Sequence, residues 1–162
     1  MAILKDYSSD PNCEVEINFN LVNDSSVRFY IYFRGGRDFP RVHKEFACLK
    51  EDFFKLLVDL KHFDSIHLSI LEPKDPGLSI YHIPHYRKYY YPQYGFLQIP
   101  EHERTESETR YKLIFVLDAN EKNHFGPREC GPAFCIIVKM EQIIEFVDKL
   151  KLEVICFNKI TR

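Results

Sequence analysis

Two stretches near the start of the chain alternate between apolar and polar residues with a period of two. In the stretch 13–21 the odd positions are apolar and the even positions polar, and 27–34 also alternates. A short polar link, Asn23-Asp24-Ser25-Ser26, joins them, and Gly35-Gly36 follows the second stretch. This period is typical of a strand with one face in water. Two such strands joined by a short polar link predict an antiparallel hairpin.

Further strands are expected along the rest of the chain. Short runs of apolar residues predict them at 42–48, 66–71, 78–83, 109–117 and 133–138, with a shorter one at 96–99. The run 133–138 is continuously apolar, which predicts a strand buried on both faces. The stretch 84–107, which is polar and aromatic and contains three prolines, is expected to be largely a long surface segment.

Two helices are expected from spacings of three and four residues between apolar positions. A helix from Lys50 to His62 would bury one face, made of Phe53, Leu56, Leu57 and Leu60. A helix over 139–150 would bury Met140, Ile143, Ile144, Val147 and Leu150 and turn Glu141, Glu145 and Asp148 to water. The segment 152–157 either extends that helix or forms a last strand.

These elements predict an α+β fold in which two amphipathic helices pack on the apolar face of a mostly antiparallel sheet. The 162 residues suit a single domain, 1–162. With 45% hydrophobic and 28% charged residues the composition is that of a globular protein, which excludes a disordered or coiled-coil chain. A net charge of −2 argues against a generally basic nucleic-acid binder, and no apolar run approaches the roughly 18 residues of a membrane helix.

The cysteines and the first residues predict a cytoplasmic protein. The opening residues show no apolar core of a secretion signal. Five cysteines cannot all pair within one chain, and none forms a C-x-x-C, so free thiols in a reducing compartment are expected. Cys48, Cys135 and Cys156 lie in apolar strings, where a cysteine is expected to be a small buried hydrophobe.

The search for catalytic and metal-binding patterns yields only weak candidates. His82 and His85 form an H-x-x-H that could share a metal with His62 or His67, and Cys130 and Cys135 form a C-x4-C. Cys130 with His124 could act as a thiol and its base. Core packing and turn chemistry explain these residues better, so no catalytic residue, cofactor or metal ligand is predicted, and the chain is expected not to be an enzyme.

Residues 81–96 contain six tyrosines together with Arg87 and Lys88. Tyrosine is favoured at protein interfaces because it offers a large, stiff contact area with a polar tip. The same segment could stack the bases of single-stranded nucleic acid, or it could be a loop pinned to the sheet by its rings.

Four glutamates between 101 and 108, here called the acidic strip, follow this segment. Their negative charge would repel nucleic acid, so they favour a protein partner. The acidic strip is either a solvated surface or a patch that steers a partner with a basic surface. The predicted partner-binding residues are therefore Tyr89, Tyr90, Tyr91, Tyr94, Glu101, Glu103, Glu106 and Glu108.

The passages 49–57 (LKEDFFKLL) and 133–147 (AFCIIVKMEQIIEFV), each joining a strand to a helix, carry a resemblance to a family. The architecture resembles the small cytoplasmic immunity proteins of bacterial polymorphic-toxin and contact-dependent growth inhibition systems. That resemblance implies a non-catalytic inhibitor that binds one toxin domain and blocks or distorts its active site. The alternatives are a single-stranded nucleic-acid binder that uses 81–96, and an enzyme with a site near His82, His85 or Cys130. The sequence does not specify an oligomeric state.

Overall fold

The computed structural model describes the backbone of residues 1–7, 13–36, 40, 42–62, 69–71, 77–85, 88–91, 95–98, 110–117 and 131–160. Side chains are described for the same residues except 84–85, 88–91, 95–98 and 158–160. In chain order the elements are β1 (Ala2–Lys5), β2 (Glu14–Val22), β3 (Ser26–Arg34), β4 (Val42–Leu49), α1 (Lys50–Asp59), β5 (Ser69–Leu71), β6 (Leu78–His85), β7 (Lys88–Tyr91), β8 (Gly95–Gln98), β9 (Arg110–Leu117), β10 (Ala133–Lys139) and α2 (Met140–Ile160).

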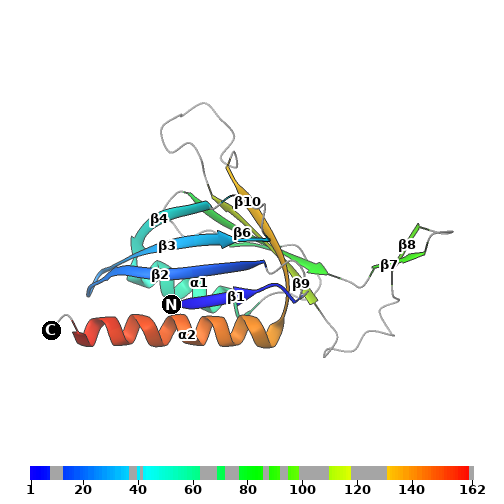
Figure 1. Ribbon diagram of the computed structural model, residues 1–162. Coiled ribbons are helices and arrows are strands. Elements are labelled where there is room, and N and C mark those ends of the chain that lie inside the picture. Colours follow the sequence, from blue (N-terminus) through cyan, green and yellow to red (C-terminus); the bar gives the residue numbers. More distant parts are fainter. Residues whose placement is uncertain are drawn as a thin grey trace.

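The strands form two four-stranded antiparallel sheets (Figure 1). Sheet A has the order β1-β2-β3-β4, sheet B has the order β10-β9-β6-β5, and β7 pairs with β8 as a separate two-stranded sheet. The α+β class, the antiparallel pairing and the two packed helices are confirmed. The prediction placed the strands in one sheet, whereas the structure divides them between sheets A and B.

The predicted hairpin is β2–β3, and its turn is stabilised by Asn23. The Oδ1 of Asn23 accepts hydrogen bonds from the backbone N–H groups of Ser25 (2.9 Å) and Ser26 (2.6 Å). The register of the hairpin shifts between Phe19 and Leu21, which marks a β-bulge. The bulge reverses the alternation, so Leu21 is exposed and Val22 is buried, contrary to the strict alternation expected as far as position 21.

The inner face of sheet A changes its packing partner along β3. The ring of Phe33 stacks on Phe134 of sheet B, with ring centroids 5.0 Å apart. Earlier in the strand, the ring of Phe29 contacts that of Phe53 on α1 instead, with ring centroids 5.1 Å apart. The two sheets therefore meet near Phe33, and helices pack against the rest of the inner face of sheet A.

Helix α1 begins at Lys50 as predicted and turns its apolar stripe inward. Its buried residues, together with the residue that follows it, are Phe53, Leu56, Leu57 and Leu60. The helix ends at Asp59 and not at His62, because the N–H groups of Lys61 and His62 donate to carbonyl groups three residues back and close the end as a tight turn.

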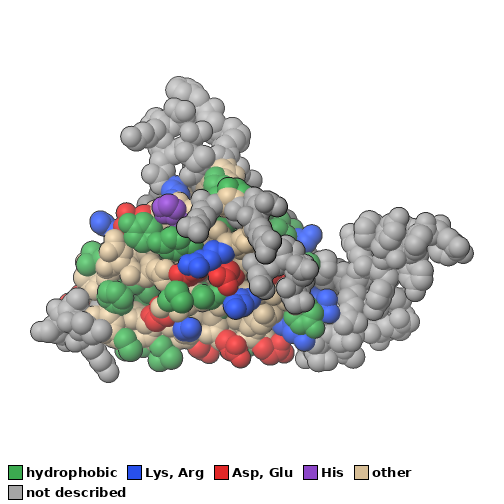
Figure 2. All heavy atoms as spheres, viewed as in Figure 1, with side chains coloured by type: hydrophobic (Ala, Val, Ile, Leu, Met, Phe, Trp, Pro, Cys, Tyr) green, Lys and Arg blue, Asp and Glu red, His purple; other side chains and the backbone are tan. Residues whose placement is uncertain are grey.

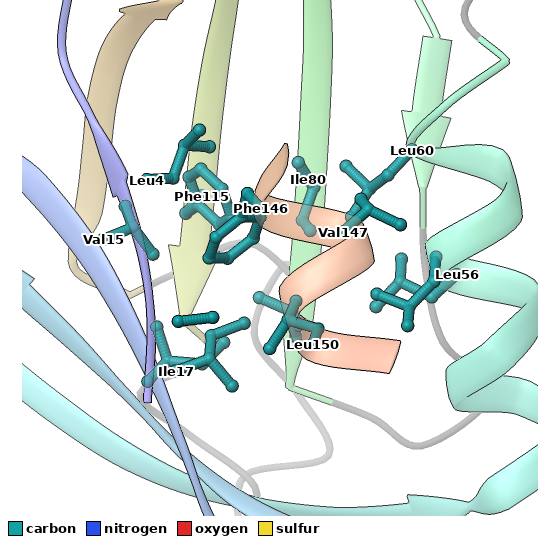
Figure 3. Close-up of a cluster of buried hydrophobic side chains, with 14 of the residues drawn as sticks. Leu4, Val15, Ile17, Leu56, Leu60, Ile80, Phe115, Phe146, Val147 and Leu150 are labelled. Atoms are coloured by element: carbon teal, nitrogen blue, oxygen red, sulfur yellow. The ribbon is translucent and has the colours of Figure 1, made fainter. Parts of the chain in front are cut away.

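Helix α2 continues through 152–157 to Ile160, so that segment extends the helix and is not a strand. Its buried residues are Ile143, Phe146, Val147, Leu150 and Val154. Ile144, predicted to be buried, is 40% exposed, and Phe146 is buried in the core instead. Figure 1 shows α2 along the β1 edge of sheet A, and Figure 3 shows its side chains among those of sheet A, sheet B and α1. All four parts of the fold thus share one hydrophobic cluster.

The prediction for β10 is correct in position and wrong in burial. Phe134, Ile136 and Val138 point into the core, whereas Ala133 and Cys135 are exposed on the other side of the strand. The described residues cover one face of β10 only. Strand β1 was not predicted, because four residues are too few to show a period.

Candidate functional site

The aromatic and acidic residues that the sequence singles out lie mostly outside the described part of the chain. Tyr89, Tyr90 and Tyr91 belong to β7, where the backbone is described and the side chains are not. Tyr94 and the four glutamates of the acidic strip lie outside the described residues, namely Glu101, Glu103, Glu106 and Glu108. Their role in partner binding stays a prediction.

His82 is a core residue on β6. It is fully buried, its Nδ1 lies 3.2 Å from the Oγ of Ser69 on β5, and its ring lies 5.0 Å from that of Tyr111 on β9. A histidine in this position packs the inner face of sheet B. His85 follows in the same strand, and its side chain is not described.

Other candidate ligands and nucleophiles fall outside the described part. These are His67, His124 and Cys130. Within the residues that the structure describes, no three side chains of histidine, cysteine, aspartate or glutamate gather as a metal site would require.

The prediction of three buried cysteines holds for one of them. Cys48 is buried in β4, while Cys135 and Cys156 are exposed and Cys13 is half-buried, all four as free thiols. Cys135 lies on the outer side of β10 and Cys156 near the end of α2. An apolar neighbourhood along the sequence therefore did not place these two thiols in the core.

The outer face of sheet A carries a cluster of rings, made of Tyr30, Tyr32 and His43. Tyr32 and His43 are cross-strand partners whose rings stack with centroids 5.5 Å apart and planes 19° apart. The ring of Tyr30 lies 6.0 Å from that of Tyr32. The helices pack on the opposite side of the sheet, so this ring cluster is open to solvent among the described elements.

A partly buried ion pair fixes the end of this face. Glu16 is 2% exposed although it lies on the outer side of β2. Its Oε1 accepts a hydrogen bond of 2.6 Å from the Nδ2 of Asn18, and its Oε2 pairs with the guanidinium of Arg34. The Nε of Arg34 also lies 3.8 Å from Glu14. These contacts hold Arg34 against the sheet although its side chain is 55% exposed.

The other end of the face carries a more exposed pair. The Nε of Arg28 lies 3.8 Å from the Oε1 of Glu45, and the Nδ2 of Asn20 donates to the same oxygen at 3.1 Å. Acidic and basic side chains therefore alternate around the ring cluster, as Figure 2 shows over β2, β3 and β4.

This combination suits contact with another protein. Tyrosine and arginine dominate binding energy at protein interfaces, and here a hydrogen-bonded sheet holds them in place before any partner arrives. Among the described residues of this face, carboxylates lie beside Arg28 and Arg34, so these residues form no continuous basic surface for a polyanion. We call this surface, made of Arg28, Tyr30, Tyr32, Arg34 and His43, the tyrosine–arginine face.

The sequence carries a signal for the tyrosine–arginine face that the prediction missed. In the predicted strand 27–34, each of the four even positions is a tyrosine or an arginine. The alternation assigns these positions to the wet face of the strand. The prediction instead weighed the density of tyrosine along the chain, which peaks at 81–96.

The thiol of Cys135 provides a direct chemical test of its surroundings. Neighbouring groups partly shield the thiol of Cys135 from water, and this desolvation raises its pKa above the ordinary value. The charge of Lys112 lowers the pKa, and that of Asp6 raises it. Because the thiolate is the reactive form, alkylation of Cys135 by iodoacetamide should reach half its maximal rate at a higher pH than in the urea-unfolded chain. Lys112→Gln should move the midpoint of this pH profile higher still. Peptide mass spectrometry measures both, and coincident profiles for the folded and unfolded chains would contradict the prediction.

Within the described residues, every helix is too short or too polar to cross a lipid bilayer. Comparison with family models, with curated proteins and with solved structures finds no match to this chain.

Proposed function

We propose that this chain is a non-catalytic protein-binding module of the cytoplasm, and within that class an immunity protein that neutralises a cognate toxin domain. The observation that supports the binding role is the tyrosine–arginine face. It presents interface-type side chains on a rigid sheet whose opposite side is fully engaged by the core. The immunity role rests in addition on the resemblance of the strand–helix passages 49–57 and 133–147.

The binding energy in this proposal comes from the rings, and the charges set orientation. Tyr32 is stacked on His43, so it loses little side-chain freedom when a partner covers it. Arg34 is already held by Glu16 and can present its remaining N–H groups to carbonyl or carboxylate groups of the partner. A toxin domain seated here would be neutralised if its active site were covered or distorted by the contact.

The acidic strip enters as the steering element. Four glutamates between 101 and 108 would attract a toxin domain with a basic surface, such as a nuclease with a phosphate-binding cleft. The rate of association should therefore fall as salt rises, because screening acts over about 8–10 Å at physiological ionic strength. A rate of association that does not change with salt would remove the strip from the proposal.

The double variant Tyr30→Ala/Tyr32→Ala tests the face itself. The tagged chain captures its partner from the native host, the captured protein is identified and expressed, and dissociation is measured by surface plasmon resonance. Loss of two central tyrosines should speed dissociation about 30-fold or more, equivalent to about 2 kcal/mol. Tyr7→Ala is the control, because Tyr7 is a tyrosine accessible to solvent that lies beyond β1 against β10.

The immunity role has its own readout. Expression of the captured protein alone should stop growth of the host, and co-expression of this chain should restore it. A harmless partner would refute the immunity role and leave the binding role standing, whereas unchanged dissociation in the double variant would refute the face. Fluorescence anisotropy with a labelled single-stranded oligonucleotide at low salt should show no binding, and binding there would favour the nucleic-acid alternative.

A further inference from the structure

The outer face of sheet B has a chemistry opposite to that of sheet A. Its middle row crosses all four strands, because Ile70, Tyr81, Ile114 and Cys135 are successive cross-strand partners. Cross-strand partners point to the same side of a sheet. Ile70 is 49% exposed, Cys135 is also exposed, and Tyr81 and Ile114 are half-buried.

The rows on either side are apolar except for Ser79 and Lys112. They consist of Ser79, Val116 and Ala133 on one side and Ile83, Lys112 and Ile137 on the other. The outward positions of an antiparallel sheet that faces water are usually polar, as they are on sheet A. The continuous apolar run of β10, which predicted burial on both faces, therefore has an outer half that no described element covers.

The size of this face matches a secondary-structure element. One row on four strands and two rows on three strands cover roughly 300 Å², given strands about 4.8 Å apart and a rise of about 3.3 Å per residue. An apolar patch of this size marks an interaction site on many proteins. An amphipathic helix of about four turns, about 10 Å wide, would cover it. The inner face of sheet A already packs against a shorter amphipathic helix, α1, through Phe29 and Phe53.

Positive charge gathers at one end of the face. Arg110 and Lys139 are cross-strand partners, and both lie over the ring of Tyr7, at 4.2 Å and 4.7 Å from its centroid. Lys112 adds a third cation one row further in. The carboxylate in this corner, Asp6, accepts a hydrogen bond of 2.7 Å from the backbone N–H of Ile137. Among the described residues none of the three cations forms an ion pair with a carboxylate.

We propose that the outer face of sheet B docks an amphipathic helix of a partner protein whose apolar stripe covers the Ile70–Cys135 row and whose carboxylates pair with Arg110, Lys112 and Lys139. The apolar rows supply the area, and the cations at one end fix the direction in which the helix lies. This site is separate from the tyrosine–arginine face and does not depend on the proposed function.

Two synthetic helical peptides of about 14 residues test the proposal. They share one leucine stripe and differ only in their flanking charges, which are glutamate in one and lysine in the other. The glutamate peptide should bind the wild-type chain about tenfold more tightly, since three partly exposed ion pairs contribute roughly this much together. The preference should shrink as salt rises from about 0.05 M to about 0.5 M.

Variants assign the binding to the face. Lys112→Glu should remove most of the charge preference, because only Arg110 and Lys139 remain against the new carboxylate. Ile70→Ser and Ile114→Ser should weaken both peptides at least fivefold. Ile70 is on an edge strand and half-exposed, so its substitution keeps the fold if Ile114→Ser does not. Lys55→Glu on α1 is the matched charge control, and Tyr30→Ala/Tyr32→Ala should bind as the wild type does.

Three results would overturn the proposal. The first is no binding of either peptide, and the second is equal binding of both. The third is a dimer in sedimentation experiments that Ile114→Ser dissociates, because the face would then be occupied by a second copy of this chain.

Discussion

Phe53→Ala should lower the free energy of unfolding by about 3–5 kcal/mol, the range for deleting a fully buried phenylalanine side chain. Phe53 is fully buried, and its ring lies 5.1 Å from that of Phe29 and 5.5 Å from that of Phe19. Through these rings Phe53 packs α1 against β2 and β3 of sheet A. Domains of ordinary stability unfold at about 5–15 kcal/mol, so the variant would be marginal.

Urea unfolding followed by circular dichroism measures this effect. Val58→Ala is the matched control on the same helix, since Val58 is 45% exposed and its truncation should change stability by no more than about 0.5 kcal/mol. Phe53→Leu keeps most of the volume and should lose about 1–2 kcal/mol, which keeps the test informative if the alanine variant does not fold. A loss below about 1 kcal/mol for Phe53→Ala would mean that neighbouring side chains such as Phe19 and Phe29 move to fill the cavity.

Arg34→Ala should destabilise the fold by about 2 kcal/mol, far more than truncation of an ordinary surface arginine. The loss leaves the carboxylate of Glu16, which is 2% exposed, without its cation. Breaking a fully buried pair costs about 3–5 kcal/mol. Arg34 itself is exposed, and Asn18 still donates to Glu16, so the expected loss is smaller.

Arg28→Ala is the control for this prediction, because it removes the same residue type from the same face of the same strand. Its pair with Glu45 is exposed on both sides, so the change should stay below about 1 kcal/mol. Adding Glu16→Gln to Arg34→Ala should recover at least about 1 kcal/mol, since the orphaned charge disappears. Equal losses for the two arginines, or no recovery in the double variant, would show that burial of Glu16 carries no such penalty.

The fold class was predictable because the two periods in the sequence report burial directly. The hairpin β2–β3 and the stripe of α1 follow from alternation and from helical spacing, and both are confirmed. The errors arise where the pattern depends on a distant partner. The bulge after Phe19 shifts the alternation by one residue, and nothing in 13–21 reveals it.

The site was less predictable for a related reason. An apolar run shows that side chains of both faces are apolar, but not whether the rest of the chain covers both faces. Strand β10 was therefore assigned two buried faces, and the structure covers one of them. Tyr30 and Tyr32 were read as strand residues, and the ring cluster that they form with His43 emerges only when β4 places His43 beside them.

Two hydrogen bonds join the residues directly after β1 to β10, and they connect segments that are synthesised far apart in time. The carboxylate of Asp6 binds the backbone of Ile137, 131 positions further along the chain, and the N–H of Tyr7 donates to the carbonyl of the same residue. β1 pairs with β2 early in the chain, but the contact of residues 6 and 7 with β10 forms only after β10 has been synthesised. Such long-range closure slows folding, and a nascent chain would expose the apolar side of β1 and β2 that packs against α2 until α2 has left the ribosome.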